Sequence, residues 1–234
     1  MIDDPRTIPV GVIGVGSMGQ HHARIMAMLP GVRLVGVADT NLGQATTIAQ
    51  RYGAKVFEDY RQMLGSVEAV SIAAPTALHH AIGVECLRHK VHVLMEKPLA
   101  GSVHEARELA EAASEAGKVL QVGHVERFNP TFTELAKVLA NERLLALEAR
   151  RLSPFVERAA GVSAVLDLMV HDLDLVMKLV GSPAVGIQAR GIRAKVPLLD
   201  HVSANIVFEN GVLASLTASK ISQQKVREIT AICE

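Results

Sequence analysis

The sequence predicts an α/β protein in two parts: an N-terminal Rossmann domain with a doubly wound parallel sheet, and a C-terminal α+β domain with a mostly antiparallel sheet. Three observations carry this prediction. A glycine-rich turn follows the first apolar strand, apolar strands then alternate with helical patterns, and the last third of the 234 residues contains successive strands without helices between them. We expect residues 1–124 to bind a dinucleotide and residues 125–234 to bind substrate and mediate oligomerisation.

The glycine-rich turn lies in the stretch VGVIGVGSMGQHH, from Val10 to His22. Gly14 permits a tight turn, Gly16 lets the backbone approach phosphates, and Gly19 lets the following helix pack closely on the strand. The N–H groups at the start of that helix attract a pyrophosphate. The loop, including Ser17 and Met18, is therefore a candidate cofactor site, although glycines also simply terminate strands.

The second strand ends at Asp39, where an acidic residue is expected to bind the adenosine ribose. Its carboxylate would accept hydrogen bonds from free ribose hydroxyls and repel a 2′-phosphate, and the following Thr40 and Asn41 add no cation. The predicted cofactor is therefore NAD, with NADP less favoured.

Hydrophobic periodicity predicts the elements of the first part. The first predicted strand begins at Val10, and the others are Val32–Ala38, Lys55–Phe57, Ala69–Ala74, Val91–Met95 and Val119–Val122. The first predicted helix follows the glycine loop, and the next are Leu42–Tyr52, a short segment after Asp59, and Thr76–Arg88. The last predicted helix begins with a capping box formed by Ser102 and Glu105 and ends at Gly117.

The second part is predicted to begin with helix Pro130–Leu139, strand Leu144–Arg151 and a long helix from Ser163 to Leu179. Four strand patterns follow: Val185–Ile192, Val202–Phe208, Val212–Ser219 and Val226–Cys233. Asn210-Gly211 predicts a two-residue hairpin turn. Because the sequence stops within a strand pattern, we expect this sheet to be incomplete at the C-terminus.

Composition excludes several classes of protein. The sequence has 24 basic and 24 acidic side chains and no Lys/Arg run, so we expect neither a nucleic-acid nor a membrane-surface partner. No apolar run approaches the roughly 20 residues of a membrane span, and the N-terminus lacks a signal-peptide pattern, which predicts a cytoplasmic protein. Cys86 and Cys233 are expected in the core, and the pairs His21-His22 and His79-His80 lack metal-ligand spacing, so no metal is predicted.

Two stretches are candidates for catalysis. Lys97, in Met95-Glu96-Lys97-Pro98, follows the fifth strand at the edge where parallel sheets bind ligands. It could polarise a substrate hydroxyl or be an exposed loop lysine, and a cis peptide before Pro98 is plausible. Asp167 and His171 are four residues apart on a mostly apolar helix, with Asp174 three residues later. A histidine oriented by a carboxylate can accept the proton of an alcohol, although a capped or solvated polar face would give the same pattern.

Further polar residues lie where strands of the first part end. Ala74, Pro75, Thr76 and His79 surround the end of the fourth strand, where Thr76 could cap the helix or contact the cofactor. The segment GHVERFNP, which holds His124, Glu126, Arg127 and Asn129, follows the sixth strand. Its arginine could bind a substrate phosphate or brace the interface between domains.

Together these motifs resemble the Gfo/Idh/MocA family of NAD(P)-dependent sugar and polyol dehydrogenases. The resemblance is carried by GVGSMG, the Asp39 position, APTALH at 74–79, EKP at 96–98, RFNP at 127–130 and the Asp167–Asp174 run. It implies a homo-oligomer formed through the C-terminal sheet and a catalytic set of Lys97, His171 and Asp167. It also implies cofactor contacts from the glycine loop, the 74–79 segment, Glu96 and Lys97, and substrate contacts from Lys97, His124, Arg127, Asn129, Asp167 and His171.

The loop GHVERFNP looks most like that of the family members that oxidise the 3-hydroxyl of UDP-N-acetylglucosamine. A nucleotide sugar would give Arg127 and Arg151 a diphosphate to bind. The predicted activity is therefore hydride transfer between a sugar or nucleotide-sugar secondary alcohol and NAD. The alternatives are a reductase for another polyol or a non-sugar substrate, a non-catalytic NAD-binding regulator, and an inactive fragment.

Overall fold

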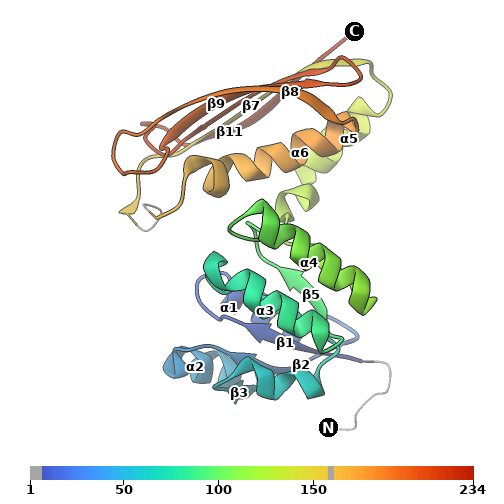
Figure 1. The fold of residues 1–234 in the computed structure, drawn as a ribbon, viewed down its shortest axis with the longest axis vertical. Coiled ribbons are helices and arrows are strands. Elements are labelled where there is room, and N and C mark those ends of the chain that lie inside the picture. The colour runs from blue at the N-terminus through green and yellow to red at the C-terminus, as the bar shows by residue number, and fades with distance from the viewer. Residues whose placement is uncertain (1–6, 158–160) are drawn as a thin grey trace. The chain divides into compact units, whose positions relative to one another are not determined.

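The computed structural model describes residues 7–157 and 161–234. The chain divides into two compact units (Figure 1), the first ending at Gly123 and the second beginning at His124. The junction expected from the sequence lies one residue later.

The first unit is built on a six-stranded sheet in the order β3-β2-β1-β4-β5-β6. All its strand pairs are parallel. The strands are β1 (Ile8–Ile13), β2 (Val32–Ala38), β3 (Lys55–Phe57), β4 (Ala69–Ile72), β5 (His92–Met95) and β6 (Leu120–Val122). The order reverses between β1 and β4, and ligands of such sheets bind beside the carboxyl ends of the strands at this switch point.

Helices cover both faces of this sheet, and each face has its own apolar core. The helices are α1 (Gly19–Met28), α2 (Leu42–Tyr52), the 3₁₀ helix η1 (Tyr60–Ser66), α3 (Thr76–Arg88) and α4 (Val103–Ala116). One core includes Ala23 of α1 and Ile48 of α2, and the other includes Leu87 of α3 and Leu109 of α4. The predicted Rossmann architecture is confirmed, and Ser102 and Glu105 form the expected capping box.

The second unit contains a five-stranded sheet in the order β11-β7-β10-β9-β8. Its strands are β7 (Leu144–Leu152), β8 (Ala184–Ile192), β9 (His201–Phe208), β10 (Leu213–Ser219) and β11 (Val226–Cys233). Only the β10–β7 pair is parallel among these strands, so the predicted mostly antiparallel sheet is confirmed. A hairpin joins β9 to β10 as predicted, but the prediction of a two-residue turn was wrong. The N–H of Phe208 donates to the carbonyl oxygen of Val212, so the loop has three residues, Glu209 to Gly211, and only Gly211 among them has a positive φ, of 87°.

The helices of the second unit are the 3₁₀ helix η2 (Val125–Phe128), α5 (Pro130–Leu139), the π-helical segment η4 (Val165–Met169) and α6 (Val170–Val180). The sequence predicted one continuous α-helix from Ser163 to Leu179, and this was wrong for its first turn: the N–H of Val170 donates to the carbonyl oxygen of Val165. Nearly every position of this segment is apolar, so its pattern does not reveal the number of residues per turn.

Helix α6 packs on one face of the second sheet (Figure 1), where Val176 and Val180 join Ile206 and Leu216 in a single apolar core. Along β9 buried and exposed residues alternate. The opposite face of the sheet is therefore open, and Val207 on it is 42% exposed.

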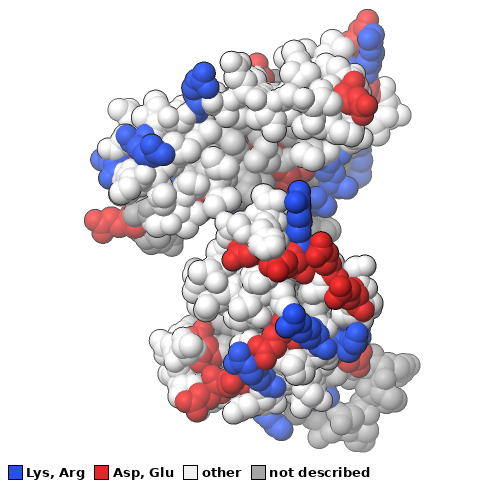
Figure 2. Space-filling model, viewed as in Figure 1, with Lys and Arg blue, Asp and Glu red and all other residues white. Residues whose placement is uncertain are grey.

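No helix of the described residues is long and apolar enough to cross a membrane. Figure 2 shows acidic and basic side chains interspersed over the visible face of the first unit.

Within the described ranges, no three His, Cys, Asp or Glu side chains gather as metal ligands would. Cys86 is fully buried, which raises the pKa of its thiol to about 12, and Cys233 is half-buried.

Candidate active site

The glycine loop leaves β1 and enters α1 with almost no space for side chains. Gly14 has a φ of 82°, and a Cβ there would lie 2.8 Å from the backbone of Ala73 and Ala74. A Cβ on Gly19 would lie 1.8 Å from the carbonyl oxygen of Gly14. Gly16, by contrast, has nothing within 4 Å of the position of a Cβ and is exposed. Gly14 and Gly19 are thus needed to form the loop, whereas Gly16 leaves open space where a phosphate would approach.

Asp39, at the carboxyl end of β2, holds the glycine loop in place. One carboxylate oxygen accepts the N–H of Val15 at 2.7 Å and the other accepts the N–H of Asn41 at 2.8 Å. A carboxylate offers about four acceptor positions, so its remaining lone pairs can still bind ribose hydroxyls. Asp39 therefore has a structural contact in addition to the cofactor contact that the sequence predicts.

A pocket of about 680 Å³ lies at the switch point of the sheet. Its lining includes Gly14, Gly16, Ser17, Met18, Asp39, Ala74 and Pro75 of the predicted cofactor residues. Gly19, Thr76, His79, Glu96 and Lys97 are not part of this lining. The pocket is also lined by Glu58, Tyr60 and Arg61, which sequence reasoning did not select. An open glycine at the start of a helix and an acidic residue at the end of β2 suit a dinucleotide.

Glu96 is buried directly before Lys97 and is held by two neighbours. Its Oε1 atom lies 2.8 Å from Nε2 of His22, and its Oε2 accepts the backbone N–H of Lys97 at 3.2 Å. The other ring nitrogen of His22 lies 2.6 Å from the hydroxyl of Ser71, which is 1% exposed. Burial acts to raise the pKa of the Glu96 carboxyl, but the hydrogen bond and charge of His22 outweigh it and the pKa lies below its ordinary value. The backbone of Lys97 is thus tied to α1 and β4.

His79 is 1% exposed and contacts only backbone carbonyl groups among its described hydrogen-bond partners. Its ring nitrogens lie 2.8 Å from the oxygen of Ala74 and 2.9 Å from the oxygen of Pro98. The Lys97-Pro98 peptide is cis. His79 therefore connects the end of β4 to the loop that carries Lys97. Thr76 is the first residue of α3 and does not cap it, because the N-cap position is Pro75 without a side-chain hydrogen bond.

In the second unit Asp167 lies in the π-helical segment η4, and His171 lies in the first turn of α6. Both side chains are half-buried. The sequence placed them four residues apart on one regular helical face. A π-helical turn holds more residues than an α-helical turn, and positions four residues apart still lie on nearly the same side of it.

Arg127 of η2 pairs with Asp174 of α6. Its Nε and Nη2 atoms donate to the two carboxylate oxygens at 2.7 and 2.5 Å, which raises the pKa of Arg127. Nε2 of His124 lies 3.6 Å from the same carboxylate. Asn129 caps α5 by accepting the N–H of Thr131 at 3.0 Å. The segment GHVERFNP is therefore anchored to α6 by charge and to α5 by a cap.

Arg151, which the sequence suggested as a residue that could meet a diphosphate, is buried and paired with carboxylates. It is 5% exposed, and its guanidinium donates to the carboxylate of Asp172 at 2.7 to 3.1 Å and to Glu126 at 3.2 Å. Burial raises the pKa of Asp172, with Arg151 opposing the shift. Burial also acts to raise the pKa of Glu126, but Asn129 and Arg151 bring it below its ordinary value. A buried cation needs such partners. The position of Arg151 in a strand with alternating apolar residues was only a weak indication that its side chain is buried.

The sequence also does not reveal His22 and Ser71, which support Glu96 next to Lys97. His22 was considered only as a metal ligand, together with His21. The one available signal was Ser71, a polar residue inside the apolar run of β4, because a buried hydroxyl requires a partner.

Comparison with known proteins identifies both units. Residues 8–124 match the model of an oxidoreductase family with an NAD-binding Rossmann fold, and residues 138–234 match the model of the GFO/IDH/MocA C-terminal domain. The chain is 36% identical over 220 residues to a UDP-N-acetylglucosamine 3-dehydrogenase of Acidithiobacillus ferrooxidans, covering 94% of this chain and 69% of that protein. It is also 38% identical over 182 residues to an inositol 2-dehydrogenase of Rubrobacter xylanophilus, covering 74% of this chain and 52% of that protein.

Solved structures agree with this assignment. The UDP-N-acetylglucosamine 3-dehydrogenase of Acidithiobacillus ferrooxidans superposes with a TM-score of 0.91 at 34% identity, covering 97% of this chain and 74% of that one. A gentamicin A biosynthesis protein in complex with NAD gives a TM-score of 0.87 at 25% identity, covering 97% of this chain and 72% of that one. The predictions of family, fold and nicotinamide-dependent dehydrogenase are confirmed. The chain therefore belongs to the GFO/IDH/MocA family of oxidoreductases.

Proposed function

We propose that this chain is an NAD-dependent dehydrogenase that oxidises the 3-hydroxyl of UDP-N-acetylglucosamine. The observation that carries the proposal is its 36% identity, over 94% of its length, to a protein named for that reaction. The resemblance of the loop GHVERFNP to the corresponding loop of such enzymes supports the same substrate. This loop holds His124 and Arg127, and we propose that it contacts the sugar nucleotide, with the Arg127–Asp174 pair and the Asn129 cap fixing its shape.

The residues around the switch-point pocket suit NAD. We expect the N–H groups from Gly16 to Gly19 to bind the pyrophosphate and Asp39 to accept the hydroxyls of the adenosine ribose. NAD, when bound, supplies the carbon that accepts a hydride from the alcohol. The acidic side chains Asp39 and Glu58 in the pocket lining disfavour the additional phosphate of NADP.

The catalytic roles follow from the chemistry of three side chains. We propose that His171 accepts the proton of the substrate hydroxyl, since a neutral imidazole is a suitable base near neutral pH. The ammonium of Lys97 binds the same oxygen and favours its deprotonation, and Asp167 orients the reacting groups. Glu96 and His79 act indirectly, by fixing the backbone on either side of Lys97. Thr76 is proposed to contact the cofactor through its position at the start of α3.

Oxidation of inositol is a second candidate. It is favoured by the 38% identity to an inositol 2-dehydrogenase over 74% of the chain. The engagement of Arg127 and Arg151 with carboxylates also removes two cations that a diphosphate would otherwise bind.

A substrate comparison tests these proposals. The purified chain is mixed with NAD and, separately, UDP-N-acetylglucosamine, its 3-deoxy analogue, myo-inositol or scyllo-inositol, and reduction of NAD is followed by absorbance. We expect turnover with UDP-N-acetylglucosamine, none with the 3-deoxy analogue, and a product lighter by two hydrogens. Turnover confined to the inositols would replace the first candidate by the second. A rise in melting temperature with NAD, measured in parallel, reports cofactor binding independently of turnover.

We further propose that the open face of the second sheet forms a homo-oligomer. Val207, Leu213 and Ile232 are each more than 40% exposed, on strands β9, β10 and β11. Exposed apolar side chains on a flat sheet suit a symmetric interface. Light scattering should detect an assembly that Leu213→Lys reduces to smaller species, and a monomeric unmodified chain would contradict this.

A further inference from the structure

Arg61 is the one described residue lining the switch-point pocket that carries a Lys or Arg side chain. The same lining contains Asp39, Glu58 and Tyr60. NAD and NADP differ by one phosphate on the adenosine ribose, and a guanidinium within reach is the usual means of binding such a group. The partners of Arg61 therefore bear directly on cofactor choice.

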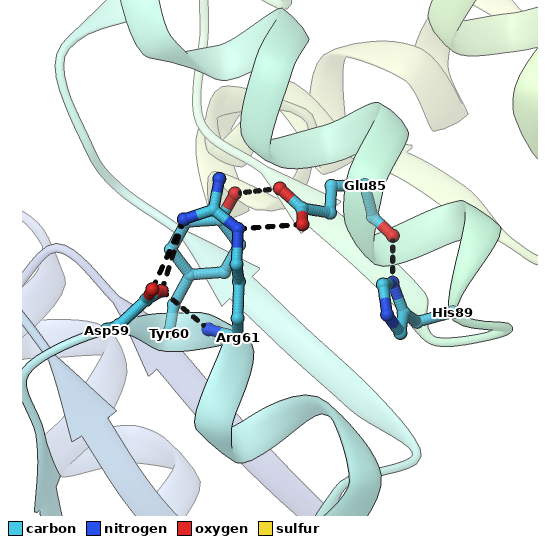
Figure 3. Close-up of polar contacts among 5 residues, drawn as sticks. All are labelled: Asp59, Tyr60, Arg61, Glu85 and His89. Atoms are coloured by element: carbon cyan, nitrogen blue, oxygen red, sulfur yellow. Dashed lines mark hydrogen bonds and ion pairs between the residues drawn. The ribbon is translucent and has the colours of Figure 1, made fainter.

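Acidic groups engage two parts of the Arg61 guanidinium (Figure 3). Nε donates to Oε1 of Glu85 at 2.7 Å, and Nη1 lies 3.3 Å from both carboxylate oxygens of Asp59. The guanidinium carbon lies 4.8 Å from the centre of the Tyr60 ring. The hydrogen bond that Arg61 donates to Glu85 raises the pKa of Arg61 and lowers the pKa of Glu85. Two carboxylates thus neutralise the one pocket cation.

Glu85 is well placed to hold Arg61 away from a ligand. It lies on α3, three residues after Ile82 and seven after Leu78, which both line the pocket. Residues at this spacing share a helix face. Glu85 therefore lies on the face of α3 that lines the pocket, farther along the helix from the glycine loop. Its second oxygen accepts the hydroxyl of Tyr60 at 2.5 Å, which fixes the carboxylate, and Nδ1 of His89 lies 2.9 Å from the backbone oxygen of Glu85 (Figure 3).

We propose that Glu85 is a specificity-determining residue for the cofactor: by holding Arg61 against α3, it keeps the one Lys or Arg side chain among the described pocket residues from binding a 2′-phosphate and so favours NAD over NADP. The inference rests on the proposed use of NAD. It adds a second determinant to Asp39. Asp39 repels the phosphate directly, while Glu85 withholds the group that would attract it.

The test compares binding of 5′-AMP and 2′,5′-ADP by isothermal titration calorimetry, because these ligands differ by the 2′-phosphate. Four proteins are measured: the unmodified chain, Asp39→Ser, Glu85→Gln and the double variant. We expect Asp39→Ser to improve the relative affinity for 2′,5′-ADP modestly, and addition of Glu85→Gln to improve it a further tenfold or so, the scale of one hydrogen bond to a charged group. An unchanged ratio on adding Glu85→Gln, or on adding Glu85→Ala, would overturn the proposal.

Two controls identify the source of the gain. Adding Arg61→Ala to the double variant should abolish the gain, because the cation is then absent. Tyr60→Phe removes the other partner of Glu85 but keeps the Arg61 pair, so it should leave the ratio unchanged. The gain should also shrink as salt rises from 0.05 to 0.5 M, since salt screens exposed charges. None of these measurements requires turnover, so a failed dehydrogenase assay and a failed specificity test remain distinct.

Discussion

Nε2 of His22 lies 2.8 Å from Oε1 of Glu96, although the two residues are 74 positions apart. The pair joins α1 to the segment that carries Lys97, and both side chains are nearly buried, at 11% and 10% exposed. A hydrogen bond between such groups matters chiefly because the loss of one partner leaves the other buried without it.

His22→Ala should therefore lower the free energy of unfolding by about 3 kcal/mol, because it leaves the Glu96 carboxylate buried without its main partner. It should also reduce turnover, because Glu96 holds the backbone N–H of Lys97. Urea unfolding followed by circular dichroism measures the first effect. The exposed neighbour His21 offers a matched control, since His21→Ala should change neither quantity. Equal stability of the two variants would refute the role of the pair.

The stability of the first unit should fall in acid through Glu96. Its pKa is lowered in the folded chain, so the unfolded chain binds more protons as the pH falls, and the free energy of unfolding decreases from about pH 5 downward. Glu96→Gln cannot titrate and should show a shallower decrease between pH 5 and pH 3. Parallel curves for the two proteins would show that Glu96 does not contribute to this dependence.

Two glycines of the loop should have different roles, Gly19 in folding and Gly16 in the binding of NAD. Gly19→Ala should prevent normal packing of α1, because its Cβ would meet the Gly14 carbonyl oxygen at 1.8 Å. Gly16→Ala should fold normally but lose most of its affinity for NAD, because the methyl group occupies the approach of the phosphates. Gly65→Ala, which also meets nothing within 4 Å but lies outside the pocket lining, is the control. Thermal melting with and without NAD separates these outcomes, and retained NAD binding by Gly16→Ala would contradict the placement of the pyrophosphate.

Removing one partner of the Arg151–Asp172 pair should lower the free energy of unfolding more than replacing both partners by apolar residues. Asp172→Ala leaves a buried guanidinium without its main partner and should destabilise the second unit by about 3–5 kcal/mol. The double variant Arg151→Met, Asp172→Leu removes both charges and should recover most of that loss. Urea unfolding of the single and double variants provides the comparison. If the double variant is no more stable than Asp172→Ala, the loss comes from packing instead of an unpaired charge.

Lys97→Ala and His171→Ala should each reduce turnover by at least about a hundredfold, the lower range for loss of a general acid or base. Because neither residue lines the switch-point pocket, both variants should keep the melting shift caused by NAD. Stopped-flow absorbance of the reduced nicotinamide gives the rates. Near-normal rates in either variant would overturn the proposed roles.

The Rossmann half could be predicted because its signals are local. The three glycines and the capping box of α4 each form a short sequence pattern, Asp39 stands at the expected distance after the glycines, and apolar periodicity marks the strands between them. Contacts between distant residues left no such pattern. Nothing near His22 indicates Glu96, and nothing near Arg151 indicates that Asp172 neutralises it instead of a diphosphate. Likewise, the sequence shows Glu85 only as one residue of a helix, whereas the structure shows that it pairs with Arg61 of η1, a residue that lines the pocket.

The π-helical turn at Val165–Met169 places Asp167 in a stretch that winds more widely than the α-helix after it. Each residue of an α-helix turns the backbone by about 100°. A π-helical turn holds about one residue more than an α-helical turn, so deleting one residue from this segment should give a regular α-helix and keep the chain on either side in place. Asp167 lies inside the segment, so a proposed catalytic residue stands where the helix can absorb a change in length.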